Sequence, residues 1–454
     1  MVTGVQTCAL PILGAFENIL RTIDEEDVLY IYLLFVDIKG HFHSIQTNSS
    51  NAYRIFSYGY DINISNIEGF EDVGVVNLYP DFDTFVIHPW RPQQGKCSSI
   101  ICNINPINNR EFNFDSRLIA IESLKNCINK ELFFTIIPSI QFYMFHTDED
   151  GNPLTVTHDK SDEYDFGPWD LGVNLRRDIT ITLQDCDIMF TSCTTKRDCG
   201  LQEINLNGAD LKRICDDINF SKEVCKTIAK RHGVHASFMP KPTNGVKGSR
   251  MQIKFMCQND EETNIFYEET DKNKISSIGY SFIAGILKYI REISIITNPL
   301  INSYKKLASD KVPRCIAWTG DSSNDSVILQ VVHTYIENDI MIQINSIDVA
   351  CNPYLTLSLL IEAGIEGIID KLTPPQEVNS NLFNKTDTEL QKLSIKSLPM
   401  SMGEALDLFK KSKFAKKILG DAIYYHVINI KEKEWTEYRR NVSEWEVNQY
   451  LLEY

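Results

Sequence analysis

The sequence has no stretch of about 18 consecutive apolar residues, the length that a helix needs to cross a membrane. It also has no excess of basic residues, because 45 Lys and Arg stand against 61 Asp and Glu and the formal net charge is −16. Binding to nucleic acid requires an excess of Lys and Arg on at least one face, since phosphates are negatively charged. These absences argue against a membrane span and against a nucleic-acid partner.

The twelve cysteines include no Cys-x-x-Cys pair. Cys186, Cys193 and Cys199 are near one another in the sequence, but their spacing matches no common zinc-binding pattern. No Lys or Arg precedes the short apolar stretch at the start, as a secretory signal would require. We therefore expect reduced thiols and a cytoplasmic protein.

The rest of the composition is typical of a folded globular protein. The 454 residues are 43% hydrophobic and 23% charged, which is enough for a sizeable core and for two or three domains. The first residues are an exception, because residues 2–12 (VTGVQTCALPI) read like the translation of a sequencing-adapter oligonucleotide. We expect residues 1–12 to be non-native and leave them out of the fold prediction.

Apolar periodicity predicts a mixture of strands and helices. A helix over 17–26 precedes two strands, over 28–36 and 42–46, which a tight turn separates. The other predicted elements are a strand over 97–104 and helices over 117–129, 208–230, 276–296, 353–372, 403–411 and 435–454.

Two segments are predicted to be irregular. The polar segment 105–113, which contains Pro106, predicts a boundary between domains over 13–110 and 111–454. The acidic, turn-rich segment 148–165 predicts a surface loop.

Residues 236–242 (ASFMPKP) resemble the Ala-Thr-Phe-Met-Pro-Lys-Pro strand and turn of the glutamine synthetase family. Further short matches follow in family order over residues 15–454, among them residues 302–307 (NSYKKL), Trp318 and residues 352–354 (NPY). The resemblance implies an α+β fold with an N-terminal β-grasp domain and a glutamine-synthetase-type catalytic domain. In that domain an antiparallel sheet with flanking helices forms a funnel, and the family assembles as two stacked six-membered rings.

The resemblance also implies a chemistry, the ATP-dependent ligation of glutamate and ammonia. In the family, Mg²⁺ or Mn²⁺ ions screen the phosphates, and carboxylates with one His hold these ions because hard cations prefer oxygen. Of six positions that correspond to metal ligands, only Glu203 keeps a carboxylate. A single carboxylate does not hold Mg²⁺ against its hydration shell. The six positions are Ser139, Gln141, Lys196, Glu203, Gln252 and Gln343.

The positions that correspond to substrate-binding and catalytic residues have changed as well. Lys306 stands for the glutamate-binding Arg and keeps its charge without the bidentate fork. Lys311 stands for the flap Glu that closes over ammonium. Asn63 stands for an Asp that helps to take a proton from ammonium in a neighbouring subunit, although Asp61 reaches this position if the loop has slipped. The other changed positions are Lys247, Lys254, Asp325, Gln330 and Asn345, the last three in place of arginines.

We therefore interpret the chain as a family member that has lost catalysis and acts as a structural, regulatory or binding homologue. No cofactor is expected, and the retained architectural motifs predict assembly with itself or with an active paralogue. Two alternatives remain open. One is an active ligase, of glutamine or of a γ-glutamyl amine, whose ligands lie elsewhere. The other is a sensor that binds an anion or a nucleotide through the lysines.

Overall fold

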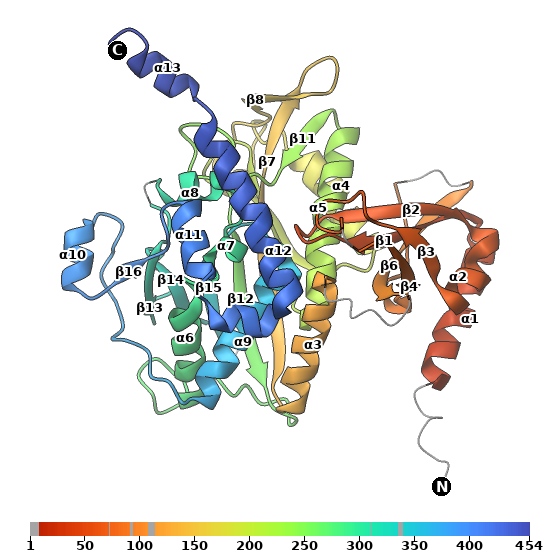
Figure 1. Cartoon of the computed structure of the whole chain (residues 1–454), viewed down its shortest axis with the longest axis horizontal. Helices are drawn as coiled ribbons and strands as arrows, with labels where there is room; N and C mark the ends of the chain where they lie inside the picture. Colours follow the sequence, from red (N-terminus) through yellow and green to blue (C-terminus); the bar gives the residue numbers. More distant parts are fainter. Residues whose placement is uncertain (1–8, 72, 91–93, 108–113, 310, 335–338) are drawn as a thin grey trace.

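The computed structural model describes residues 9–71, 73–90, 94–107, 114–309, 311–334 and 339–454. Two β-sheets organise these residues, a smaller one near the N-terminus and a larger one that most of the helices cover (Figure 1). The α+β class predicted from the sequence is confirmed.

The smaller sheet has the strand order β2-β1-β6-β4-β3, with β5 paired to β6. β1 and β2 form an antiparallel hairpin and β6 returns parallel to β1, which agrees with the predicted β-grasp arrangement. The strands are β1 (Val28–Val36), β2 (Phe42–Asn48), β3 (Tyr60–Asn63), β4 (Val75–Pro80), β5 (Val86–Ile87) and β6 (Lys96–Pro106). The accompanying helices are α1 (Ala9–Glu25) and α2 (Ala52–Tyr58), with 3-10 turns at Ser49–Asn51 and Phe82–Thr84.

The larger sheet has the strand order β16-β13-β14-β15-β12-β7-β10-β9, and both β8 and β11 pair with β7. Its pairs are antiparallel except for β13 and β14. The strands are β7 (Phe133–Thr147), β8 (Pro153–Thr157), β9 (Phe190–Thr195), β10 (Leu201–Leu206), β11 (Val234–Ser237), β12 (Met251–Gln258), β13 (Cys315–Thr319), β14 (Val327–His333), β15 (Ile340–Ile347) and β16 (Lys396–Ser397).

The helices of this part pack mainly on one face of the larger sheet (Figure 1). They are α3 (Ser116–Asn129), α4 (Val173–Asp185), α5 (Leu211–Arg231), α6 (Ser277–Tyr289), α7 (Ser294–Thr297), α8 (Ile301–Leu307), α9 (Pro353–Ile369), α10 (Asp387–Lys392), α11 (Met402–Phe409), α12 (Lys413–Arg440) and α13 (Glu444–Tyr450).

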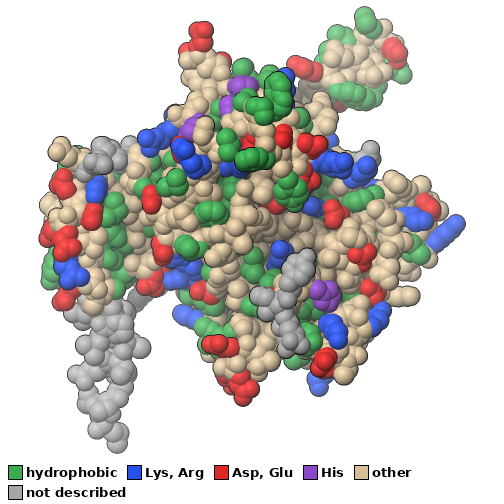
Figure 2. Space-filling view, turned by 180° about the vertical axis from the view of Figure 1, so that it is seen from behind, with side chains coloured by type: hydrophobic (Ala, Val, Ile, Leu, Met, Phe, Trp, Pro, Cys, Tyr) green, Lys and Arg blue, Asp and Glu red, His purple; other side chains and the backbone are tan. Residues whose placement is uncertain are grey.

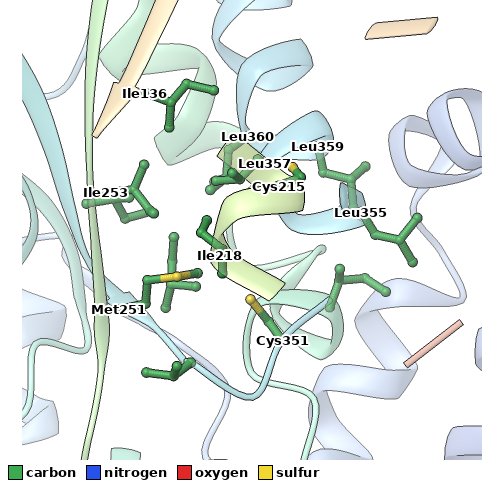
Figure 3. Packing of buried hydrophobic residues seen from close by; sticks show 14 of the residues in the cluster. Ile136, Cys215, Ile218, Met251, Ile253, Cys351, Leu355, Leu357, Leu359 and Leu360 are labelled. Atoms are coloured by element: carbon green, nitrogen blue, oxygen red, sulfur yellow. The ribbon is translucent and has the colours of Figure 1, made fainter. Parts of the chain in front are cut away.

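The alternation of side chains along β12 explains how one face of the larger sheet contacts the helices while the other carries the predicted site positions. Met251 and Ile253 are fully buried and pack with Ile218 of α5 in the main core (Figure 3). Gln252 and Lys254 are only partly buried and, with a repeat of two residues, point to the opposite face. The helices therefore cover one face of the sheet, and the predicted site positions lie on the other.

Helix α9 is buried on almost every side and packs closely against α6. A Cβ atom added at Gly285 would lie 2.1 Å from the backbone oxygen of Ala363, and one added at Gly367 would lie 2.2 Å from that of Ser281. The helix axes can approach this closely only because neither position carries a side chain.

A buried arginine joins the two sheets. The guanidinium of Arg117, on α3, is 1% exposed and donates to both oxygens of Asp216 on α5, at 2.9 and 2.7 Å. It also donates to Asp81 and to Asn103 of the smaller sheet, each at 2.6 Å. The hydroxyl of Tyr354 adds a third hydrogen bond to Asp216 at 2.7 Å. Burial alone would lower the pKa of Arg117, but the carboxylates of Asp216 and Asp81 raise it well above its ordinary value.

Three predicted elements differ from the structure. The predicted helix over 276–296 stops at Tyr289 and resumes at Ser294, and the sequence hides this break because the residues on both sides are apolar and buried. The segment 148–165 is not only a surface loop, because it contains β8 and the fully buried Asp159. The carboxylate of Asp159 accepts from the Gly200 N–H at 3.0 Å and from Gln202 Nε2 at 2.9 Å, a pairing that composition does not reveal.

The third difference lies at the C-terminal end. Instead of one helix over 435–454, α12 begins at Lys413 and ends at Arg440, and α13 follows. Ser443 and Glu446 form a capping box that starts α13. These local hydrogen bonds begin a new helix inside the segment 435–454, whose apolar pattern predicts a single one. Helix α13 extends away from the body and has no buried residue (Figure 1).

At the other end, helix α1 begins at Ala9, inside the segment that we left out of the prediction, and residues 1–8 lie outside the described part. The predicted domain boundary over 105–113 also lies mostly outside it, and β6 extends to Pro106.

The surface mixes charges of both signs. On the face shown in Figure 2, Lys and Arg side chains are interspersed with Asp and Glu. Within the described ranges, no helix combines the length and the apolar character needed to cross a membrane. The cysteines of these ranges are free thiols, and most are buried.

The first testable prediction concerns the arginine between the sheets. Arg117→Met would leave the buried carboxylate of Asp216 without its cation, whereas Asp81 would keep its 2.9 Å salt bridge with Lys212. We expect the free energy of unfolding, measured by urea denaturation, to fall by about 3–5 kcal/mol, as for other buried pairs that lose one partner. Arg177→Met is the matched control, because that side chain is 65% exposed beside Asp178 and its loss should change stability by no more than about 0.5 kcal/mol. Equal effects of the two substitutions would contradict the assignment.

Candidate functional site

The strand register brings four predicted metal positions side by side. Ser139 of β7 is paired with Asn205 of β10 and with Gln252 of β12, and Gln141 of β7 is paired with Glu203 of β10. Ser139 and Gln141 are two residues apart, so their side chains point to the same face of the sheet. The hydroxyl of Ser139 hydrogen-bonds to the side-chain oxygen of Asn205.

Both carboxylate oxygens of Glu203 already face a partner within the protein. Oε2 accepts a hydrogen bond from Nε2 of Gln141 at 2.7 Å, and Oε1 lies 3.6 Å from Nζ of Lys196. Lys196 also forms a 2.7 Å salt bridge with Glu163. Burial lowers the pKa of Lys196, but the hydrogen bond to Glu163 and the charges of Glu203 and Glu163 raise it above its ordinary value. A protonated ammonium therefore stands beside the one carboxylate of this set.

Gln252 also joins three other predicted positions, Gln330, Gln343 and Asn345, in a network of neutral amides. Oδ1 of Asn345 accepts from Nε2 of Gln252 and from Nε2 of Gln343, each at 2.7 Å. Oε1 of Gln330 accepts from Nδ2 of Asn345 at 2.7 Å and from Nε2 of Gln343 at 3.0 Å. The amides satisfy one another, so this side of the site offers neither an anionic metal ligand nor a cation for a phosphate.

Seven of the fourteen predicted positions line a cavity of about 290 Å³, hereafter the funnel cavity. Its wall comes from β7, β15, the turn before β12, helix α8 and the loops around Lys196 and Lys311. The predicted residues among its lining are Gln141, Lys196, Lys247, Lys306, Lys311, Asp325 and Asn345.

Lys306 is nearly fully buried in this wall, with 2% of its surface exposed. Its ammonium forms an ion pair with Asp348, which is 0% exposed, and donates to the backbone oxygen of Ser249 at 3.3 Å. Among the described residues, Oδ2 of Asp348 has no hydrogen-bond partner. The charge of Lys306 is thus balanced inside the protein.

The remaining predicted residues of the funnel cavity lie at its rim. Lys247 and Lys311 are exposed, and the backbone N–H of Lys247 donates to Asp198 at 2.7 Å. The carboxylate of Asp325 is 55% exposed and lies 4.0 Å from the guanidinium of Arg250.

Seven predicted positions do not line the funnel cavity: Asn63, Lys254, and five that lie on strands of the larger sheet, Ser139, Glu203, Gln252, Gln330 and Gln343. Asn63 is exposed at the end of β3, in the smaller sheet, and its side chain accepts from the N–H of Ser65 at 3.0 Å. Asp61, the alternative to Asn63, accepts from Asn77 at 2.8 Å in the same sheet. Lys254 lies on β12, opposite Gln343 of β15, one strand repeat away from Gln252.

Sequence reasoning missed two residues that shape the funnel cavity. Arg250 lines it, and its backbone N–H donates to Oε1 of Gln141 at 3.1 Å. A signal was present in the sequence, because residues 247–252 (KGSRMQ) resemble an Asn-Gly-Ser-Gly-Met-His run of the glutamine synthetase family, in which Arg250 stands at the second Gly. Glu163, the partner of Lys196, lies in the acidic segment that was predicted as a loop, and no motif marks it.

Comparison with known proteins decides the family. The model of the glutamine synthetase catalytic domain matches residues 113–450. The chain belongs to the glutamine synthetase family. A glutamine synthetase of Clostridium saccharobutylicum is 36% identical over 443 residues, which cover 96% of this chain and 99% of the relative. A glutamine synthetase of Staphylococcus aureus strain Mu50 is 36% identical over 444 residues, which cover 96% and 98%.

Solved structures agree on the fold. An apo structure of GmaS superposes with a TM-score of 0.84 at 19% identity and covers 95% of this chain and 99% of its own. A GmaS complex with ADP gives a TM-score of 0.83 at 20% identity over the same shares of the two chains. At these identities the two structures show the fold alone, which is the glutamine-synthetase-type fold expected from the sequence.

The funnel cavity does not fit the metal and nucleotide that the glutamine synthetase family uses. The one carboxylate at the predicted metal positions faces an ammonium, and the positions matched to arginines carry Asp325, Gln330 and Asn345. Within the described ranges, no three His, Cys, Asp or Glu side chains are grouped so that they could hold a metal ion. Cys186, Cys193 and Cys199, which are near one another in the sequence, therefore form no such group either.

The second testable prediction concerns the buried ion pair of the funnel cavity. Lys306→Met would leave Asp348 as an uncompensated buried charge, so we expect the free energy of unfolding in urea to fall by about 3–5 kcal/mol. Adding Asp348→Asn should recover a large part of this loss, since neither charge is then left without a partner.

The neighbouring Lys305→Met is the matched control for this pair. Lys305 is exposed and its ammonium lies over the ring of Tyr438, so we expect a loss below about 1 kcal/mol. If the double variant is no more stable than Lys306→Met alone, charge imbalance is not the cause of the loss.

Proposed function

We propose that this chain is a non-catalytic member of the glutamine synthetase family, which has lost ATP-dependent ligation of glutamate and ammonia. It acts instead as a structural, regulatory or binding homologue. The observation that carries the proposal is the surrounding of Glu203, whose two oxygens face the amide of Gln141 and the ammonium of Lys196. A divalent ion would need negative side chains around it, and here the ammonium of Lys196 lies beside the only carboxylate of the predicted metal positions.

The magnitude of the loss supports the same conclusion. Removing one preorganised electrostatic donor from an active site costs about 10²–10³ in rate. Here five of the six positions matched to metal ligands lack the ligand, and Asp325, Gln330 and Asn345 replace arginines. Asn63 adds a further change, because an amide has no proton that titrates near neutral pH and cannot act as a base. Together these changes should remove measurable phosphoryl transfer.

An active ligase, of glutamine or of a γ-glutamyl amine, is the second candidate. It is supported by the relatives named glutamine synthetase, which are 36% identical over almost the whole chain. That likeness reflects the fold, because a fold can be kept while the residues of its site change. We therefore favour the non-catalytic function on the basis of the site residues themselves.

Assembly is the expected role of the retained architecture. We propose that the chain forms a ring-like oligomer, either with itself or with an active paralogue, in the cytoplasm. Light scattering coupled to size-exclusion chromatography tests this part, and a protein that is strictly monomeric at all concentrations would contradict it.

The third testable prediction concerns activity and metal binding together. With ATP, glutamate, ammonium and either Mg²⁺ or Mn²⁺, we expect no metal-dependent phosphate release above background. We also expect electron paramagnetic resonance to find all added Mn²⁺ in its free, hydrated form in the presence of the protein. Metal-dependent turnover, or stoichiometric Mn²⁺ binding by the wild-type chain, would favour the active ligase.

A gain-of-binding variant serves as the control for this experiment. Ser139→Glu, Gln141→Glu, Lys196→Glu, Gln252→His and Gln343→Glu together restore the ligand types that hard cations prefer. The smaller variant Gln141→Glu with Lys196→Glu keeps the test usable if the larger one does not fold. Mn²⁺ binding by either variant shows that the assay detects a site in this cavity.

A further inference from the structure

A second cavity, of about 480 Å³, lies on the helical side of the larger sheet. It is bounded by the turn between β1 and β2, by α5, by β11, by the segment before α9 and by α12. It shares no lining residue with the funnel cavity. We call it the interdomain cavity, because the smaller sheet contributes Ile38 to Phe42 to a wall that otherwise comes from the larger part.

The walls of the interdomain cavity are mostly apolar. Cys351 and Leu355, which appear in the core of Figure 3, form part of the lining. The other apolar side chains include Phe42, Phe238, Ile295, Leu300, Val427 and Ile430. Cavities of about 300–1,000 Å³ with such walls and a few polar groups are typical of small-molecule sites.

Lys222 of α5 brings a charge without a counter-ion into this cavity. Its Nζ donates to the backbone oxygen of Cys351 at 3.4 Å, and no carboxylate of the described residues lies within salt-bridge distance of it. Burial lowers the pKa of Lys222 to about 8, because the ammonium is poorly solvated there. Other lysines of the wall are paired, for example Lys226 with Glu223 and Lys431 with Glu434, both at 2.8 Å.

Asn219 provides a second donor that has no partner. Its side chain is 3% exposed and lines the interdomain cavity, and Nδ2 has no hydrogen-bond partner among the described residues. Asn219 and Lys222 are three residues apart on α5, so they lie on the same face of the helix. A buried donor without a partner destabilises the free protein, and a ligand that accepts its hydrogen bond would relieve this cost.

We propose that the interdomain cavity binds a small apolar molecule that carries one carboxylate. The carboxylate accepts hydrogen bonds from the ammonium of Lys222 and from the amide of Asn219, and the apolar part contacts the hydrophobic walls. A neutral carbonyl would leave the ammonium without a counter-ion, and a phosphate would bring two negative charges to one cation among apolar walls.

The fourth testable prediction uses 4-phenylbutanoate as the probe and isothermal titration calorimetry on the full chain at pH 7. We expect saturable binding of one molecule per chain. The neutral analogue 4-phenylbutanamide, which has nearly the same shape, should bind at least tenfold more weakly. Equal binding of the two compounds, or no saturable binding of the carboxylate, overturns the proposal.

Two substitutions locate the site. Lys222→Met should weaken binding of 4-phenylbutanoate at least tenfold. Asn219→Asp should also abolish binding, but it gives Lys222 an internal carboxylate and should therefore raise the melting temperature of the free protein. Lys226→Met is the matched control, because it lies one helical turn after Lys222, is 44% exposed and already pairs with Glu223. Unchanged affinity in Lys222→Met, or an equal loss in Lys226→Met, contradicts the proposal.

This inference is independent of the proposed function. The interdomain cavity and the funnel cavity have separate linings, so metal-dependent turnover at one says nothing about binding at the other. Failure of the calorimetric test therefore leaves the non-catalytic proposal unaffected, and the reverse also holds.

Discussion

The guanidinium of Arg117 is the interaction on which the arrangement of the two sheets depends. It is the cation of a buried cluster in which Asp216 comes from α5, while Asp81 and Asn103 come from the smaller sheet. Planar donors in a fixed fork suit this role, because they can satisfy several oxygens from different elements at once. A buried charge is tolerated only where partners surround it, so the cluster fixes how the smaller sheet sits against α5. The β1–β2 turn has its own hydrogen bonds to the larger part, from Ser116 Oγ to Asp37 O at 3.3 Å and from Asn352 Nδ2 to Ile38 O at 3.1 Å, and it lines the interdomain cavity.

The second constraint is the two-residue repeat of the strands. On β12 the repeat sends Met251 and Ile253 into the core and Gln252 and Lys254 to the opposite face. Packing and chemistry therefore occupy different faces of one backbone, and substitution on one face leaves the other unchanged. The chain is 36% identical to a glutamine synthetase over nearly its whole length, and such a sheet allows side chains opposite the core to change without loss of the fold. The family and fold follow from the core face, whereas activity is decided on the other face.

Much of the fold could be predicted from the sequence, because strand periodicity and the short family motifs are local signals. The β1–β2 hairpin, helix α5 and helix α9 lie where apolar patterns place them. The break after Tyr289 could not be predicted, since residues on both sides of it are apolar and buried. For the site, motif alignment proposed Gln141, Lys196 and Lys306, and all three line the funnel cavity. Their partners could not be derived, because Glu163 and Asp348 meet the lysines only through folding. The interdomain cavity likewise has no sequence signal, since the elements around Lys222 are distant in the chain.

The positions matched to metal ligands and arginines have two physically different surroundings, one neutral and one ionic. A group of acidic side chains without a cation suffers mutual repulsion, which raises their pKa values and costs stability. On β12, β14 and β15 the surrounding is neutral, since the side-chain amides of Gln252, Gln330, Gln343 and Asn345 hydrogen-bond to one another and carry no charge. Near β9 and β10 the surrounding is ionic, since the ammonium of Lys196 balances the carboxylates of Glu203 and Glu163. Such an ion pair is favoured where water still reaches the charges, and the side chain of Lys196 is 20% exposed. Of the amides, Gln330 and Asn345 are almost fully buried, where an unbalanced charge would be far more costly, and Gln252 is partly exposed. Glu203 and Gln343 are equally deep, at 7% and 8% exposed, so the feature that distinguishes the two positions is the ammonium of Lys196 beside Glu203.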